Sequence, residues 1–520
     1  MNKFTEDIVI GEKYKRAKEL SIHIKELLNN DKKQAFKLIE KELLGLIDIN
    51  NNVKNNIIKN IIEEKKKKKL MFFYPQWFTG GVERTLNNIW NYLINYYEIY
   101  FVSNNKINSV IKIPDEIIHI EVSDMIIKTN LDYTLFTLSM VLNIDVVIGC
   151  ASLFEKAFNF YKLASGTIKT IASNHGYYFD IYEDTLNYSI AEKRLNALEF
   201  VDAAVWLTNF STYVYNNYNK NGCIIENANV YEIKNNVEHK KKEKIILCIG
   251  RFNDYVKRID RILKCFSKVL TKIPDAKLIL LGKFNIELPY KPFSYITIED
   301  IVEELNINDN NIYYINEVSD MEKYYSIASV LLLASNSEGF GMVLTEAACF
   351  GVPSVCNYIP GLEDIIIDGE NGFFTSQGDI DSMADRICEI LNNESLRVRM
   401  GEMAMKLAKR YEINKIGEKW RLLIETILSD KPYEEKWYII NKNLGVEYNN
   451  IDLYAKNLCN EIRNLLNILI RYTDNNCIIN RKYNFFIFHY FAIKEFYHKY
   501  GLKRTAKKLF LKIGRKFKLL

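Results

Sequence analysis

Short apolar runs alternate with amphipathic helical segments along most of this 520-residue chain. Examples early in the chain are LMFFYP (70–75), YEIYFVS (97–103), IDVVIGC (144–150), TIKTIAS (167–173) and AAVWLT (203–208). Such runs have the length and composition of buried strands, and strands that alternate with helices predict mostly parallel sheets covered by helices. The fold class that we expect is therefore α/β.

The alternation occurs twice. A polar stretch, NNVEHKKKEK (235–244), interrupts it, and KIILCIG, AKLILLG, NIYYI and SVLLLAS then continue it. Two blocks of similar size predict two Rossmann-like, doubly wound domains that face each other across a cleft, with ligands at the carboxyl ends of the strands. The boundaries that we expect are a charged helical extension 1–69, domains 70–230 and 244–415, a linker 231–243, a helix 416–432 and a helical extension 433–520.

Composition and apolar runs indicate the class of protein and its compartment. The net charge of +5 is too small to demand a nucleic-acid partner, and nine cysteines without a C-x-x-C pair favour a reducing compartment. The N-terminus has no apolar signal-peptide core. No apolar run reaches the roughly 20 residues of a membrane-spanning helix. We therefore expect a cytoplasmic protein.

The last 20 residues, GLKRTAKKLFLKIGRKFKLL (501–520), place apolar side chains at helical spacing and fill the other positions with Lys and Arg. This pattern favours a helix on an anionic membrane surface, and hence a peripheral protein on the inner face of the membrane. The alternative is a helix docked on its own protein with a solvated basic face. The lysine run EEKKKKKL before residue 71 indicates a solvated approach to the first strand.

Two glutamates eight residues apart stand in SNSEGFGMVLTEAACFGVPSV (335–355). The apolar run before them predicts a strand, so Glu338 falls in the following loop and Glu346 in the second turn of a helix. Glycines in such a loop let the backbone approach a ligand, and a helix N-terminus suits a phosphate. For two glutamates alone, a surface loop and helix with two solvated glutamates is the favoured interpretation.

Two cations lie upstream in CIGRFNDYVKRID. Arg251 follows a predicted strand, and Lys257 stands at the expected start of a helix. Cations directed into a cleft can neutralise a leaving diphosphate without a metal. A basic helix start facing solvent is the alternative.

Together these segments resemble the retaining glycosyltransferase family 4, which has the GT-B fold. The resemblance rests on E-G-F-G followed by E-A and G-V-P, on G-R-x5-K around Arg251 and Lys257, and on their order within residues 70–430. It implies transfer of a sugar from a nucleoside diphosphate sugar, with UDP favoured, to a hydroxyl acceptor, without cofactor or metal. The acceptor would be a surface glycan, a lipid-linked glycan or a protein. Residues 70–230 would bind the acceptor and residues 244–415 the donor, and helix 416–432 would cross back to the first domain.

The resemblance also implies residue roles. Glu338 would hold the transferred sugar and Glu346 the ribose, while Arg251 and Lys257 would stabilise the departing diphosphate. His175, in SNHG after a strand, would lie near the donor sugar. Further donor contacts would come from glycine loops and their neighbours, namely Gly80, Gly81, Gly339, Phe340, Gly341, Gly361 and Leu362.

Three further segments lie near these motifs in the sequence. Asp379 and Asp381 resemble a D-x-D metal motif, but they open a helical run in which Asp is a good cap, so we expect no metal there. The pairs Asp368-Gly369 and Asn371-Gly372 indicate turns. The segment IIENANV (224–230) departs from the proline-containing turn of the family.

Two rival functions remain. A catalytically silent GT-B scaffold would not need Arg251, Lys257, Glu338 and Glu346 together. GT-B epimerases lack the E-G-F-G context, and the phosphorylases are much longer and need pyridoxal phosphate bound to a lysine.

Overall fold

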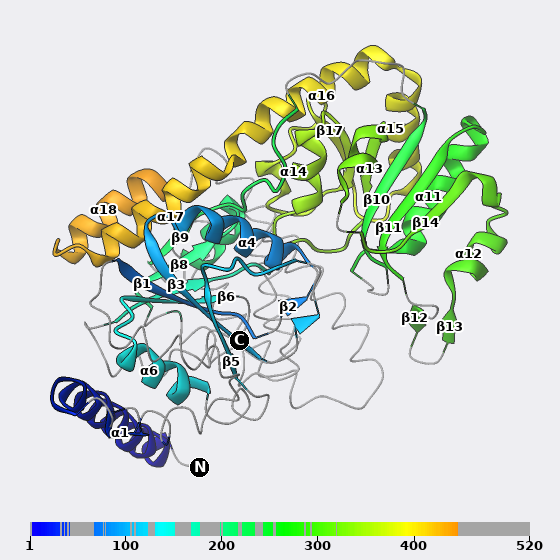
Figure 1. The fold of residues 1–520 in the computed structure, drawn as a ribbon. Coiled ribbons are helices and arrows are strands. Elements are labelled where there is room, and N and C mark those ends of the chain that lie inside the picture. The colour runs from blue at the N-terminus through cyan, green and yellow to red at the C-terminus, as the bar shows by residue number, and fades with distance from the viewer. Residues whose placement is uncertain are drawn as a thin grey trace, which may run out of the picture.

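The fold is that of a computed structural model. Apart from isolated positions and pairs, it describes residues 3–31, 67–75, 80–104, 111–122, 131–150, 168–176, 201–216, 221–234, 243–252, 256–284, 288–291, 294–318 and 320–445. These residues form two α/β lobes, each built on a parallel sheet (Figure 1). The predicted α/β class with two Rossmann-like lobes is therefore confirmed.

The first sheet has the order β5-β3-β1-β6-β7-β8-β9, and all its neighbouring strands are parallel. Successive side chains of β1 enter different cores: Leu70 and Phe72 one, Met71 and Phe73 the other. Burial on both faces explains the continuous apolar runs of the sequence. The strands are β1 (Lys68–Phe73), β3 (Tyr97–Asn104), β5 (Ile118–Val122), β6 (Val146–Cys150), β7 (Lys169–Ser173), β8 (Ala203–Trp206) and β9 (Gly222–Ile224).

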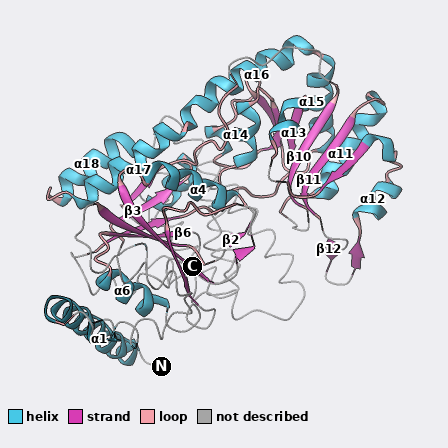
Figure 2. Cartoon of the chain, in the orientation of Figure 1, coloured by secondary structure: helices cyan, strands magenta, loops and turns pink. Residues whose placement is uncertain are grey.

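Helices cover this sheet (Figure 2). The helix α4 (Gly81–Leu93) buries Leu86, Ile89, Trp90 and Leu93. On the other side lie α6 (Leu131–Val141) and, packed against it, the N-terminal helix α1 (Lys3–Asn30), whose Ser21 hydroxyl donates to the Met140 carbonyl. The helix α10 (Asn209–Asn216) follows β8.

The second sheet is also parallel throughout, with the order β14-β11-β10-β15-β16-β17. Its strands are β10 (Ile245–Arg251), β11 (Lys277–Lys283), β14 (Ile312–Ile315), β15 (Val330–Leu333), β16 (Ser354–Asn357) and β17 (Gly372–Thr375). Its helices are α11 (Ile259–Lys272), α12 (Ile298–Glu304), α13 (Glu322–Ile327), α14 (Met342–Cys349), α15 (Ile380–Asn392) and α16 (Glu394–Ala408), with the 3-10 turns η3 (Asp309–Asn311), η4 (Leu362–Asp364) and η5 (Lys409–Tyr411).

Each sheet reverses its order at one pair of neighbouring strands, β1 with β6 and β10 with β15. The carboxyl ends of strands at such a reversal leave a crevice for ligands. The chain leaves β1 toward α4, ends β10 at Arg251, and leaves β15 toward the loop that contains Glu338. The topology thus brings the predicted site segments to the two reversal points.

The helix α17 (Ile413–Leu428) runs from the second lobe back to the first and lies on α4 (Figure 1). Its Ile416, Trp420 and Leu423 join the core that contains Trp90. Gly417 permits this approach, because an added Cβ would lie 2.3 Å from the Tyr92 ring. The segment expected to cross back to the first domain does so.

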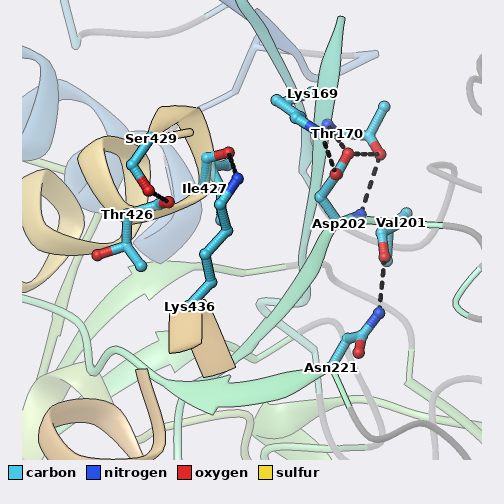
Figure 3. Close-up of polar contacts among 9 residues, drawn as sticks. All are labelled: Lys169, Thr170, Val201, Asp202, Asn221, Thr426, Ile427, Ser429 and Lys436. Atoms are coloured by element: carbon cyan, nitrogen blue, oxygen red, sulfur yellow. Dashed lines mark hydrogen bonds and ion pairs between the residues drawn. The ribbon is translucent and has the colours of Figure 1, made fainter. Parts of the chain in front are cut away.

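A further helix, α18 (Tyr433–Leu444), continues the crossover and packs near β9. Lys436 on α18 donates to the carbonyl of Ile427, which helps to fix the angle between α17 and α18 (Figure 3). At the same end of the first sheet, the Asp202 carboxylate accepts from Lys169 Nζ and Thr170 N, tying β7 to the start of β8 (Figure 3).

Two small sheets complete the described structure, β2 (Trp77–Phe78) with β4 (Ile107–Asn108) and β12 (Leu288–Lys291) with β13 (Ser294–Ile296). None of the helices within the described residues is both long and apolar enough to cross a membrane. The basic segment 501–520 lies outside the described residues.

Every apolar run named above forms a strand, but the sequence did not reveal β5, β9, β16 or β17. Gly372 was expected in a turn and instead begins β17, where an added Cβ would lie 2.4 Å from the Ser354 carbonyl oxygen. Lys257 was expected at a helix start, yet α11 begins only at Ile259, after Arg258 in a left-handed conformation. The left-handed residue ends the preceding turn, so Lys257 belongs to that turn.

Candidate functional site

A cavity of about 530 Å³ lies between the lobes at the reversal points of both sheets. The first lobe contributes Tyr74, Gly80, Gly81, Glu83, Arg84, His175 and Asn227. The second lobe contributes residues that include Gly250, Arg251, Lys257, Gly282, Glu338, Gly339, Phe340, Gly341, Met342 and Glu346. Of the site residues predicted from the sequence, all except Gly361 and Leu362 line this cavity.

The lobes touch where the loop after β15 meets the end of β7. An added Cβ on Gly339 would lie 2.5 Å from the carbonyl oxygen of His175 and 3.0 Å from Gly176. A side chain at this position would force the lobes apart, so glycine is needed for contact across the cleft. Gly341 adopts φ +83° as the cap residue immediately before α14, while Phe340 is buried against Tyr411.

Lys257 and Glu338 form an ion pair, with Lys257 Nζ 2.6 Å from Glu338 Oε1. Their side chains are 18% and 11% exposed, so the pair is largely withdrawn from solvent. The Lys257 stem passes over Gly250, where an added Cβ would lie 3.2 Å from its methylene carbons. Arg251 follows as the exposed last residue of β10 and also lines the cavity. A flexible cation and a guanidinium thus share one wall with a carboxylate.

Glu346 lies deeper, 2% exposed. The Tyr325 hydroxyl donates to its Oε2 over 2.5 Å, and Arg84 Nη1 lies 4.0 Å from its Oε1. Burial raises the pKa of Glu346, whereas the Arg84 charge and the Tyr325 hydrogen bond oppose that rise. The Glu346 carboxylate therefore lines the cavity and interacts with one residue of each lobe, Arg84 of the first and Tyr325 of the second.

His175 follows β7, and its Nε2 lies 3.1 Å from the Ser173 hydroxyl oxygen. Burial lowers the pKa of His175 to about 4, and the Asn227 side chain opposes this shift. The imidazole is therefore neutral near pH 7 and can exchange hydrogen bonds with a ligand without adding charge to the cavity.

The glycine pair of the first lobe stands at the N-terminus of α4. Gly80 is the cap residue and Gly81 begins the helix, so backbone N–H groups are directed toward the cavity. Beside them, Glu83 is 3% exposed, and its Oε2 would lie 2.8 Å from a Cβ on Gly80. Burial and the nearby Glu83 carboxylate raise the pKa of Tyr74, which therefore keeps its proton.

Gly361 and Leu362 differ from the expectation, because neither lines the cavity. Gly361 adopts φ +101°, and an added Cβ would lie 2.9 Å from the Thr208 hydroxyl oxygen. Leu362 is buried, with its Cδ2 3.1 Å from where a Cβ on Gly341 would lie. Both residues support the walls of the cleft, so a direct contact with a ligand would require movement.

Asp379 caps α15, as expected, and its carboxylate accepts from Ser382 N. Asp381 pairs with Lys268 on α11. Across the part of the chain that the structure describes, no group of three or more His, Cys, Asp or Glu side chains is arranged to hold a metal ion.

Sequence reasoning missed Glu83, Arg84, Asn227 and Tyr325. Glu83 and Arg84 follow the glycine pair after one residue, Val82, in GGVER, so their place on the first turn of α4 was a usable signal. Asn227 lies in the atypical segment IIENANV. Tyr325 had no sequence signal, because only the packing of α13 on α14 brings it to Glu346.

Comparison with known proteins agrees with this architecture. Residues 229–407 match the family model of Glycosyl transferases group 1. N-acetyl-alpha-D-glucosaminyl L-malate synthase of Bacillus anthracis is 29% identical over 191 residues, which cover 36% of this chain and 47% of that protein. Capsular polysaccharide biosynthesis glycosyltransferase CapM of Staphylococcus aureus is 26% identical over 206 residues, which cover 38% of this chain and 52% of CapM. The chain thus spans about half the length of these two relatives.

A glycosyltransferase of Haemophilus influenzae described as uncharacterized is 27% identical over 354 residues, covering 66% of this chain and 95% of that protein. HepE of Anabaena, solved in complex with UDP, superposes with a TM-score of 0.55 at 15% identity, covering 69% of this chain and 100% of HepE. At 15% sequence identity, the structural similarity to HepE establishes the fold alone. Residues 229–407 therefore match a Glycosyl transferases group 1 domain, and the two lobes have the GT-B fold.

Proposed function

We propose that this protein is a retaining glycosyltransferase that moves a sugar from a nucleoside diphosphate sugar, preferably a UDP-sugar, to a hydroxyl acceptor. The observation that carries the proposal is the contact between Lys257 Nζ and Glu338 Oε1, at 2.6 Å, in a cleft that Arg251 and Glu346 also line. The cavity of about 530 Å³ has a volume typical of small-molecule sites.

The charges are suited to a departing diphosphate. Lys257 and Arg251 would neutralise the negative charge that develops on the phosphate oxygens, and a preorganised cation lowers the barrier without reorganisation. Glu338 would accept from hydroxyls of the transferred sugar, and Glu346 from the ribose. The N–H groups at Gly80 and Gly81 would face the phosphates from the first lobe.

The proposed transfer keeps the anomeric configuration. The bond between the anomeric carbon and the phosphate oxygen breaks, and a bond from the same carbon to the acceptor oxygen forms on the same face. The proton of the acceptor hydroxyl passes to the leaving phosphate. This course follows from the resemblance to retaining enzymes, and it needs no protein nucleophile.

The acceptor is proposed to be a surface polysaccharide or a lipid-linked glycan, with a protein as the alternative. The similarity to CapM, whose name places it in capsular polysaccharide biosynthesis, favours a glycan. The UDP bound by HepE likewise favours UDP as the donor nucleotide.

The donor site is tested by thermal shift with UDP, GDP, ADP and CMP. A ligand that binds only the native state raises the melting temperature by mass action. We expect one nucleotide to stabilise the wild type but not the Lys257→Ala/Glu346→Ala variant. The matched control, Lys268→Ala/Glu389→Ala, removes exposed charges of α11 and α15 and should respond like the wild type. No shift of the wild type with any nucleotide at millimolar concentration would instead favour a catalytically silent scaffold.

The reaction is proposed to be metal-independent. Lys257 and Arg251 supply the positive charge that a divalent cation would otherwise provide. We expect full activity in excess EDTA, whereas a strict requirement for manganese would contradict this part of the proposal.

A cytoplasmic location at the membrane edge is proposed from the basic segment 501–520. Deletion of these residues should release the protein from vesicles that contain anionic lipid. Unchanged co-sedimentation of the truncated protein would refute the membrane contact.

A further inference from the structure

Arg84 and Glu346 come from different lobes and meet at the cavity. Arg84 belongs to the first turn of α4, beside the first sheet, and Glu346 belongs to α14, beside the second. Arg84 Nη1 lies 4.0 Å from Glu346 Oε1, and the two side chains are only 13% and 2% exposed. Both residues also line the cavity. A charge from one lobe therefore faces a buried charge of the other at the place proposed for the nucleotide.

The surroundings fix both side chains. The Tyr325 hydroxyl donates to Glu346 Oε2, and Tyr231 Oη lies 3.5 Å from Arg84 Nη1. The rings of Tyr231 and Tyr325 meet edge to face at 5.9 Å, and both pack on Phe350. Tyr231 stands in the segment that leads from the first lobe to the second, so three separate parts of the chain converge on one carboxylate.

We propose that Arg84 is a positioning residue of the donor site. Through Arg84, the first lobe keeps Glu346 ionised and oriented for the nucleotide. The inference rests on the proposed function, in which Glu346 accepts from the ribose hydroxyls. Its consequence is that a complete donor site exists only while the lobes are together. The residues 229–407 that match the family model would then be insufficient for full nucleotide affinity.

The physical reason is the cost of a buried negative charge. The groups that face Glu346 are Arg84 on α4, Tyr325 on α13, Tyr231 in the connecting segment and Cys349 on α14 itself. Of these four, Arg84 is the cation. Without it, burial would raise the pKa of Glu346 further, and a protonated carboxyl offers the ribose a poorer acceptor.

The test measures UDP affinity between pH 6 and 8 for the wild type, Arg84→Met and Arg84→Lys. We expect Arg84→Met to weaken binding about tenfold at pH 7, with a larger loss at pH 6 and recovery toward pH 8. Arg84→Lys should restore the wild-type pH profile. In an Arg84→Met/Glu346→Gln variant, the affinity should equal that of Glu346→Gln alone. Equal weakening at every pH, or full additivity, would overturn the proposal.

The control Arg421→Met removes a partly exposed arginine of α17, which pairs with Glu418 and Glu425, and should leave UDP affinity unchanged. A second readout does not need a nucleotide. For each variant, the melting temperature is compared with that of the wild type at each pH. This difference should become more negative with rising pH for Arg84→Met, since ionisation of an unpaired Glu346 destabilises the fold. It should change less for Arg84→Met/Glu346→Gln, which has no carboxyl to ionise at position 346. Parallel pH curves for Arg84→Met and Arg84→Met/Glu346→Gln would refute the role of Arg84, and this test requires no nucleotide binding. Failure of the wild type to bind any nucleotide would instead refute the proposed function.

Discussion

Lys257 Nζ lies 2.6 Å from Glu338 Oε1, although 81 residues separate them in the chain. The two residues follow β10 and β15, the neighbouring strands at which the second sheet reverses its order. The lysine thus contacts the carboxylate that is proposed to bind the sugar. A donor would exchange this contact for one between Lys257 and its phosphates.

Lys257→Ala should remove the preference of the protein for a nucleoside diphosphate over the monophosphate. The lysine is proposed to neutralise the departing diphosphate, whose outer phosphate UMP lacks, so UDP affinity should fall while UMP affinity stays nearly constant. Turnover should fall about 10²- to 10³-fold, the usual cost of losing one preorganised charge partner of a transition state. Calorimetric titration with UDP and UMP, with Lys268→Ala as control, checks the prediction. Near-normal turnover would remove Lys257 from the catalytic role.

Gly339→Ala should separate the lobes. The added methyl group would lie 2.5 Å from the His175 carbonyl oxygen, and backbone cannot yield as a flexible side chain does. We expect a lower melting temperature and a larger radius of gyration in solution scattering, both measured without ligand. Gly81→Ala is the control, since its Cβ would meet Met342 Cγ at an ordinary 3.6 Å. Identical scattering curves for wild type and Gly339→Ala would contradict the prediction.

Gly417→Ala should weaken the crossover helix. Its methyl group would lie 2.3 Å from the Tyr92 ring, and overpacking of this kind costs about 1–3 kcal/mol. Tyr92→Ala opens the space but loses the hydrogen bond between the Tyr92 hydroxyl and Glu418. In a double-mutant cycle followed by thermal unfolding, the two substitutions together should therefore destabilise less than their sum. Additive effects would mean that α17 does not lie against Tyr92.

Glu363→Gln should change the pH dependence of stability. Burial, with the nearby Asp364 carboxylate, raises the pKa of Glu363 to about 7 from an ordinary 4.5. Between these values the native state binds more protons than the unfolded chain, so the Glu363 contribution to stability is lost as pH rises. The glutamine of the variant can still accept the hydrogen bond from Gly361 N. Above pH 7, the variant should be more stable than the wild type by about 1 kcal/mol.

Melting temperatures from pH 4.5 to 8 provide the measurement. The difference between Glu363→Gln and wild type should grow across this window, whereas Glu389→Gln, an exposed α15 substitution, should give a constant difference. A constant difference for Glu363→Gln as well would show that this carboxyl titrates normally.

The sequence by itself determined the two-lobed α/β fold, because buried parallel strands require apolar runs on both faces and helices require a period near 3.6. The resemblance of its motifs to a known family placed Arg251, Lys257, Glu338 and Glu346 in one cleft, and residues after parallel strands do share one edge of a sheet. The short strands β9, β16 and β17 were not predicted, because three or four residues carry too little pattern to distinguish a strand from a loop.

Tertiary structure alone decided which residues complete the cleft and how closely the lobes meet. Arg84 and Tyr325 reach Glu346 only because α4 and α13 pack beside α14, and no local pattern encodes that packing. Gly361 and Leu362 follow the family pattern in sequence yet support the wall rather than line it. A sequence records which groups follow a strand, but their contacts depend on how the two lobes approach each other. That approach is set by side chains distant in the chain, such as Gly339 against His175 and Gly417 against Tyr92.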